Sequence, residues 1–285
     1  MAHMPVIEVP DTAWRNNAAS GSTRRIADEV AIAVTYDGTT HAVMMATPAD
    51  LEDFAVGFSL AEGIIATPAE IAGIEPTMHA LGIDLRIAFA GDSADRFWAR
   101  RRAMAGPVGC GLCGIDSLKE ARRPSPRVTP GDRFPAAAIL AAVRALPPLQ
   151  PLNHHTRAMH AAAYWTRSAG IRAVREDVGR HNALDKLCGA MARQGIAMEQ
   201  GVALLTSRVS VEMVQKLAVA GCPVLVAVSA PTALAVATAK AAGITLVAIA
   251  RDDGFEVFTH PERIAFEELP APPVCEWRGS AKAVP

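Results

Sequence analysis

The chain has 285 residues, of which 51% are hydrophobic and 20% are charged, and its formal net charge is −1. This is the composition of an ordinary globular protein, long enough for one large α/β domain or two smaller ones. The near-neutral charge argues against nucleic acid or an acidic membrane surface as a partner. The sequence shows neither an unbroken apolar run that would span a membrane nor a secretion signal, so we expect a cytoplasmic protein.

The first part of the sequence predicts a small α+β lobe over residues 23–104, preceded by a flexible N-terminus at residues 1–22. Alternating apolar residues indicate strands, and Thr47, followed by Pro48 and acidic residues, indicates the capped start of a helix. In chain order, the expected elements are strands over 28–38 and 41–48, a helix over 47–65, a strand over 82–91 and a helix over 93–106.

Residues 105–134 are rich in glycine and proline and contain the stretch GPVGCGLCGIDS, which predicts a mobile loop between two lobes. Residues 135–265 then alternate between buried-looking strands and helices, as in a mostly parallel sheet covered by helices. The tail, residues 266–285, is expected to be loose. The expected elements are helices over 135–146, 179–195, 209–221 and 232–243, two strands within 160–177, and strands over 201–207, 223–229 and 244–250.

Polar residues follow the predicted strands of the second domain. In open α/β sheets, ligands bind outside the carboxyl ends of the strands. The segments REDVGRH, TSRVS, SAPT and ARDDG stand at four such ends, so we expect them to converge on one ligand-binding crevice. Strand ends also collect polar residues that have no function, and this alternative stays open.

The five cysteines divide into one reactive pair and three others. An odd number of cysteines in a chain without a signal peptide indicates reduced thiols. Cys188 and Cys222 lie in apolar surroundings, which favours inert packing, and Cys275 lies in the tail. Cys110 and Cys113 have glycines before, between and after them. We therefore expect these two to be the reactive pair.

A Cys-x-x-Cys pair can belong to a zinc site, but a structural zinc site needs four ligands and the sequence has no second pair. The His-x-Glu motif at His260–Glu262 follows the cysteines, whereas in zinc deaminases it precedes them. We therefore expect no metal site. A thioredoxin-like motif would start a helix at its first cysteine, which the glycines disfavour without excluding.

A sulfur carrier is the third interpretation of the pair. It needs an exposed and flexible thiolate, and nearby cations favour the thiolate form. Between Arg96 and Arg127, eight Lys and Arg side chains stand against two Asp and Glu side chains. A solvated basic loop without this function would show the same excess of Lys and Arg, so this alternative stays open.

Seven segments resemble the formate dehydrogenase accessory sulfurtransferase family, called FdhD, over about residues 28 to 264. They are TPADLEDFAVGFSLAEGII, CGLCG, HAAA, REDVGRHNALDK, SRVSVEMVQKLAVAG, SAPTALAV and FTHPERI. The resemblance implies a cytoplasmic homodimer. It also implies a three-layer α/β domain similar to cytidine deaminase but without its zinc, beside the smaller lobe.

The resemblance implies transfer of persulfide sulfur from a cysteine desulfurase to the bis-molybdopterin guanine dinucleotide cofactor that formate dehydrogenase needs. Cys110 would carry the persulfide and Cys113 would assist. The alternatives are a chaperone that binds the cofactor without moving sulfur, and an enzyme on the same scaffold, such as a metal-free or rewired relative of the deaminases. The cofactor, or a guanine nucleotide as its analogue, would contact Thr156, His160, Arg180, His181, Arg208, Ile249, Ala250, Arg251, Asp252, Asp253 and Gly254.

The sequence departs from the family in two segments that usually contain glycine. Residues 156–160 read TRAMH where members have T-G-G-x-H, and residues 206–208 read TSR where members have S-G-R. Arg157 would either add a charged group to the nucleotide pocket or fill it. Four residues of REDVGRHNALDK could equally contact the ligand or form an internal ion-pair network: Glu176, Asp177, Asp185 and Lys186.

Overall fold

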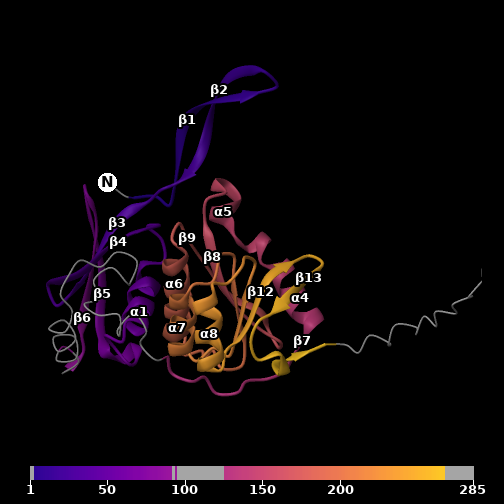
Figure 1. Ribbon diagram of the computed structural model, residues 1–285. Coiled ribbons are helices and arrows are strands. Elements are labelled where there is room, and N and C mark those ends of the chain that lie inside the picture. The colour runs from indigo at the N-terminus through magenta and orange to yellow at the C-terminus, as the bar shows by residue number, and fades with distance from the viewer. Residues whose placement is uncertain (1–2, 92–93, 95–124, 267–285) are drawn as a thin grey trace, which may run out of the picture.

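The computed structural model describes residues 3–91, 94 and 125–266. It shows a β-hairpin at the N-terminus, a small lobe and a larger α/β domain (Figure 1). The helix expected over 93–106, most of the loop expected over 105–134 and nearly all of the tail lie outside the described residues. Within the described ranges, no helix is both long enough and apolar enough to span a membrane.

Residues 6–27 form a long hairpin where the sequence predicted a flexible N-terminus. β1 (Val6–Arg15) pairs antiparallel with β2 (Ala18–Ala27), and the turn residues Asn16 and Asn17 both have positive φ. The hairpin stands away from the body of the molecule (Figure 1), and Trp14 near its tip is 68% exposed. No strand was predicted here because the hairpin buries almost none of its side chains, so its apolar residues follow no period.

The small lobe is a four-stranded sheet with the order β4-β3-β6-β5, covered on one face by α1. The strands expected over 28–38, 41–48 and 82–91 are confirmed, whereas β5 was not expected. Ile32, Val34 and Leu85 from the sheet pack against Phe54 and Phe58 of α1. The elements are β3 (Val30–Tyr36), β4 (Thr39–Ala46), α1 (Leu51–Ala61), the 3-10 helix η1 (Pro68–Glu70), β5 (Ile71–His79) and β6 (Gly82–Phe89).

The prediction that Thr47 caps the first helix is wrong. The helix begins at Leu51, and its N-cap residue Asp50 has φ of 53° and makes no side-chain capping hydrogen bond. The Thr47 hydroxyl instead accepts a hydrogen bond from the backbone N–H of Val178, at 3.1 Å. Thr47 therefore connects the small lobe to the larger domain.

The larger domain contains a six-stranded sheet with the order β13-β12-β11-β10-β8-β9. The β10–β11 and β11–β12 pairings are parallel, as predicted for the β-α-β-α-β run, whereas the other three pairings of the sheet are antiparallel. The hairpins β8–β9 and β12–β13 add antiparallel strands at both sides. The strands are β8 (His160–Thr166), β9 (Gly170–Asp177), β10 (Val202–Leu205), β11 (Val224–Ala227), β12 (Thr245–Arg251) and β13 (Gly254–Val257).

Helices cover both faces of this sheet and give the domain three layers (Figure 1). Successive residues of a strand point to opposite faces: Leu205 and Leu225 pack in the core under α6, α7 and α8, while Leu204 and Val224 pack under α4. The expected helices are confirmed, and α5 is additional. The elements are α4 (Ala136–Ala145), α5 (Pro151–Thr156), α6 (Arg180–Arg193), α7 (Val211–Val219) and α8 (Ala233–Ala242), with 3-10 helices at Pro147–Leu149 and Pro261–Arg263 and a short parallel pair β7 (Phe134–Pro135) and β14 (Ile264–Ala265).

Two glycines allow α1 to cross α6 with their backbones nearly in contact. A Cβ atom on Gly57 would lie 1.7 Å from the carbonyl oxygen of Asp185, and one on Gly189 would lie 1.9 Å from that of Asp53. No side chain fits at these distances. The two domains are therefore joined by a close helix pair, which fixes the small lobe against the helical layer of the large sheet.

Candidate cofactor-binding site

The carboxyl ends of four strands meet at one edge of the six-stranded sheet. β10, β11 and β12 are parallel, and β9 runs in the same direction because β8 is antiparallel to both β9 and β10. The structure therefore brings the predicted cofactor residues to one edge, on the segments next to these strand ends. They are Thr156 at the end of α5, His160 at the start of β8, Arg180 and His181 at the start of α6, Arg208 after β10, and Ile249 to Gly254 at the β12–β13 turn.

His160 is half-buried on this edge and lies directly opposite Asp177 in the β8–β9 ladder. Burial lowers the pKa of His160, and the positive charge of Arg180 lowers it further. The imidazole is therefore mainly neutral at pH 7, and a neutral imidazole can both donate and accept a hydrogen bond.

Sequence reasoning missed Glu212, which lies in the first turn of α7 beside His181. His181 Nε2 is 3.9 Å from Glu212 Oε2, and each side chain is 17% exposed. His181 lowers the pKa of Glu212 to about 2, more than offsetting the effect of burial. Acidic residues are common in the first turn of helices, so Glu212 gave no signal beyond its place shortly after a strand.

The Thr156 hydroxyl makes its hydrogen bonds within its own segment of the chain. The Thr156 hydroxyl donates to the carbonyl of Leu152 at 2.9 Å and accepts from the N–H of Ala158 at 3.3 Å, so this side chain is occupied. Arg157 ends α5 with φ of 59° and is exposed. A left-handed backbone favours glycine, which is the residue that the family resemblance places here.

The turn at residues 249–254 contains an unusual backbone conformation. Ile249 has φ of 54° at an irregularity in the β12–β13 register, and positive φ is rare for a β-branched residue. Such strain occurs most often at functional sites. Arg251 is exposed but donates to the carbonyls of Val228 and Ala250, so the protein backbone uses part of the guanidinium that was expected to bind phosphate.

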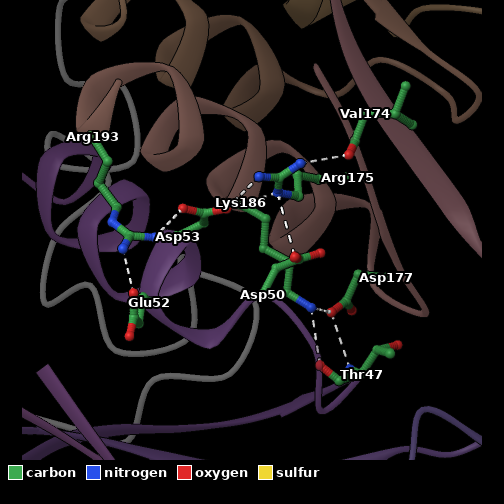
Figure 2. Close-up of polar contacts among 9 residues, drawn as sticks. All are labelled: Thr47, Asp50, Glu52, Asp53, Val174, Arg175, Asp177, Lys186 and Arg193. Atoms are coloured by element: carbon green, nitrogen blue, oxygen red, sulfur yellow. Dashed lines mark hydrogen bonds and ion pairs between the residues drawn. The ribbon is translucent and has the colours of Figure 1, made fainter. Parts of the chain in front are cut away.

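Buried ion pairs explain most of the REDVGRHNALDK motif (Figure 2). Asp177 and Lys186 are completely buried and lie 2.6 Å apart. Asp177 also accepts hydrogen bonds from the N–H groups of Thr47 and Gly179 and from the Asn182 amide. Each lone pair of this carboxylate therefore points to protein, and Asp177 has no capacity left for a ligand.

Further acidic residues are paired in the same way. Asp185 is buried and holds Lys216 at 2.7 Å, while Asp53 on α1 binds both Arg175 and Arg193 across the domain boundary (Figure 2). Glu176 accepts the N–H groups of Leu152 and Asn153 at the start of α5. The structure supports the internal ion pairs for Asp177, Asp185 and Lys186, whereas Glu176 is used by the two backbone hydrogen bonds at α5.

The cysteines of the proposed sulfur chemistry, Cys110 and Cys113, lie outside the described residues, as does Cys275. Cys188 and Cys222 are buried free thiols, as expected for inert packing. Burial raises the pKa of Cys222 to about 12 and raises that of Cys188 as well. Among the described residues, no group of three or more His, Cys, Asp or Glu side chains is arranged to hold a metal ion.

The model of the FdhD/NarQ family matches residues 27–265. The chain belongs to this family. Curated relatives include the "Sulfur carrier protein FdhD" of Agrobacterium fabrum, 53% identical over 257 residues that cover 90% of this chain and 95% of the relative. The protein of the same description from Brucella abortus is 52% identical and covers 90% of this chain and 96% of its own length.

A solved FdhD/NarQ-like fold agrees with this membership. The crystal structure of a candidate formate dehydrogenase accessory protein from Desulfotalea psychrophila superimposes with a TM-score of 0.73 at 27% sequence identity. The match covers 91% of this chain and 99% of the other. Most of this chain thus shares its architecture with nearly the whole of that protein.

Proposed function

We propose that this FdhD/NarQ family member is a sulfur carrier that takes persulfide sulfur from a cysteine desulfurase and delivers it to bis-molybdopterin guanine dinucleotide for formate dehydrogenase. The identity of 53% to a named sulfur carrier, over 90% of this chain, carries the proposal. The Cys-x-x-Cys pair supplies the required thiols. The protein acts in the cytoplasm as a homodimer.

In the first step, the thiolate of Cys110 attacks the outer sulfur of a persulfide on the desulfurase. The S–S bond of the donor breaks, the donor cysteine leaves as a thiolate, and Cys110 becomes a persulfide. The basic residues around the pair favour the thiolate form of Cys110.

The second step moves this sulfur to the molybdenum-containing acceptor, which is a substrate of the protein. Releasing the outer sulfur as sulfide requires two electrons. Cys113 supplies them by attacking the inner sulfur of the Cys110 persulfide, which forms a Cys110–Cys113 disulfide and frees sulfide for the metal. A cytoplasmic thiol reductant then regenerates both thiols.

The acceptor would lie at the carboxyl edge of the six-stranded sheet. Arg180, Arg208 and Arg251 stand there, and guanidinium groups suit the oxygens of a pyrophosphate. Ile249 to Gly254 would approach the nucleotide with their backbone, while His160 and His181 would offer ring N–H donors. This three-layer domain would use a cytidine-deaminase-like scaffold for binding, without zinc.

Intact-mass measurement tests the proposal. After incubation with a cysteine desulfurase and free cysteine, the protein should gain about 32 Da, the mass of one sulfur atom in a persulfide. The Cys110→Ala variant should not gain it, and the Cys188→Ala variant should. No adduct on the wild-type protein, or an adduct that persists in Cys110→Ala, would contradict the sulfur-carrier role.

A further inference from the structure

Four buried polar atoms without a hydrogen-bond partner gather where α6 and α7 begin. They are Arg180 Nε, His181 Nε2, Ser210 Oγ and Glu212 Oε2, and they make up four of the nine such atoms in the described part of the chain. Leaving a buried polar group unpaired is unfavourable, and folded proteins pair most of these groups. Their concentration at the carboxyl edge of the sheet indicates a place where a ligand completes the hydrogen bonding.

The pattern of these groups is a cationic donor beside an acceptor. The carboxylate of Glu212 is held anionic by its surroundings, since His181 lowers its pKa to about 2. The 3.9 Å between His181 Nε2 and Glu212 Oε2 is too long for a hydrogen bond. At this spacing, each of the two side chains can form a hydrogen bond to one of two adjacent atoms on the edge of a planar ring.

Ser210 adds a second acceptor and is not needed to start α7. It occupies the N-cap position, but its hydroxyl makes no capping hydrogen bond. Capping serine side chains usually accept a backbone N–H. The Ser210 hydroxyl thus remains available beside Glu212.

A 2-amino-4-oxopyrimidine ring has the complementary edge: a carbonyl oxygen, a ring N–H and an amino group in a row. A carboxylate can accept from the N–H and the amino group together, while Arg180 or His181 donates to the carbonyl. We propose that Glu212, flanked by His181, Arg180 and Ser210, binds this edge, which guanine and pterin share. The inference rests on the proposed function, because both rings occur in the proposed acceptor.

Adenine and hypoxanthine rings provide the discriminating comparison. Adenine lacks both the carbonyl and the ring N–H of this edge, and hypoxanthine lacks only the amino group. Because a hydrogen bond to a charged group contributes about 1.5–3 kcal/mol, loss of the amino group should weaken binding by roughly 10- to 100-fold.

Calorimetric titration of the full chain tests the inference with two ligand series. Guanosine diphosphate is compared with inosine and adenosine diphosphates, and neopterin is compared with a lumazine that carries oxygen in place of the amino group. The wild-type protein should prefer the amino-bearing ring in at least one series, and the series that shows the preference identifies the ring. Glu212→Gln should lose the preference, and Ser210→Ala should reduce it with α7 intact.

The matched control is Glu75→Gln, which removes an exposed carboxylate from β5 in the small lobe. It should retain the wild-type preference. Equal binding of amino-bearing and amino-free rings in both series, or an unchanged preference in both Glu212→Gln and Ser210→Ala, overturns the inference. These results are independent of the persulfide adduct on Cys110, whose absence would instead refute the sulfur-carrier function.

Discussion

Lys186 Nζ lies 2.6 Å from Asp177 Oδ2, and neither side chain has any exposed surface. The Lys186 ammonium also donates to the carbonyl of Thr47, at 2.9 Å. A buried charge is tolerated only when it is paired and fully hydrogen bonded. This pair therefore holds β9, α6 and the end of β4 in one arrangement, from which the candidate site extends.

Replacing Lys186 with methionine should strongly destabilise the protein. The substitution keeps the length of the side chain but leaves the buried Asp177 carboxylate without its counter-ion. Breaking a buried pair from one side costs about 3–5 kcal/mol, which urea unfolding at pH 7 would measure. Lys240→Met, at an exposed position on α8, should change the free energy of unfolding by less than about 0.5 kcal/mol. Equal stability of the two variants would disprove the structural role of the pair.

Adding a methyl group at Gly189 should push α1 and α6 apart. Its Cβ would lie 1.9 Å from the Asp53 carbonyl oxygen, which is backbone and cannot rotate away. Alanine normally stabilises a helix interior relative to glycine by about 1 kcal/mol, so the sign of the effect is diagnostic. We expect Gly189→Ala to lower the free energy of unfolding by at least about 2 kcal/mol. In Gly21→Ala, where the added Cβ meets no atom within 4 Å, a comparable loss would count against the close crossing.

The sequence predicted the elements that bury a regular apolar face. The β-α-β-α-β run from β10 to β12 was found because its strands are apolar throughout and its helices have one apolar side. The hairpin of residues 6–27 was not predicted because it is almost wholly exposed. β13 was not predicted as a strand, and the antiparallel direction of β8 was not predicted because apolar periodicity does not encode the direction of a strand.

The candidate site was found in outline for a different reason. Polar residues after apolar strands located the sheet edge, and the family resemblance implied the roles of Arg180, His181 and Arg208 at that edge. Glu212 was missed because one acid in a helical turn is unremarkable in sequence. Whether Asp177 and Lys186 bind a ligand or each other depends on the three-dimensional placement of Thr47, which lies 130 residues from Asp177 in the chain.

Arg157→Gly should stabilise the protein slightly. The arginine adopts φ of 59° at the end of α5, a conformation that costs a non-glycine residue about 1–2 kcal/mol. Glycine removes this strain but loses more entropy on folding, so we expect a net gain of up to about 1 kcal/mol. Thermal unfolding would show it as a higher Tm. Arg172→Gly, in the ordinary extended backbone of β9, should lower Tm, and a lower Tm for Arg157→Gly would contradict the prediction.

The His181–Glu212 pair should make stability depend on pH in acid. The pKa of Glu212 is about 2 in the folded protein and 4.5 in the absence of neighbours. Because the folded carboxyl binds its proton less readily, the contribution is present above pH 4.5 and is lost as the pH falls toward 2; it amounts to at most about 3 kcal/mol. Glu212→Gln should therefore be less stable than the wild-type protein at pH 6, and the difference should shrink by pH 3. Urea unfolding at both values measures it, with Glu75→Gln as the control for general acid effects. A difference between Glu212→Gln and wild type that stays constant from pH 6 to pH 3 would show that His181 does not hold the Glu212 carboxylate in its charged form.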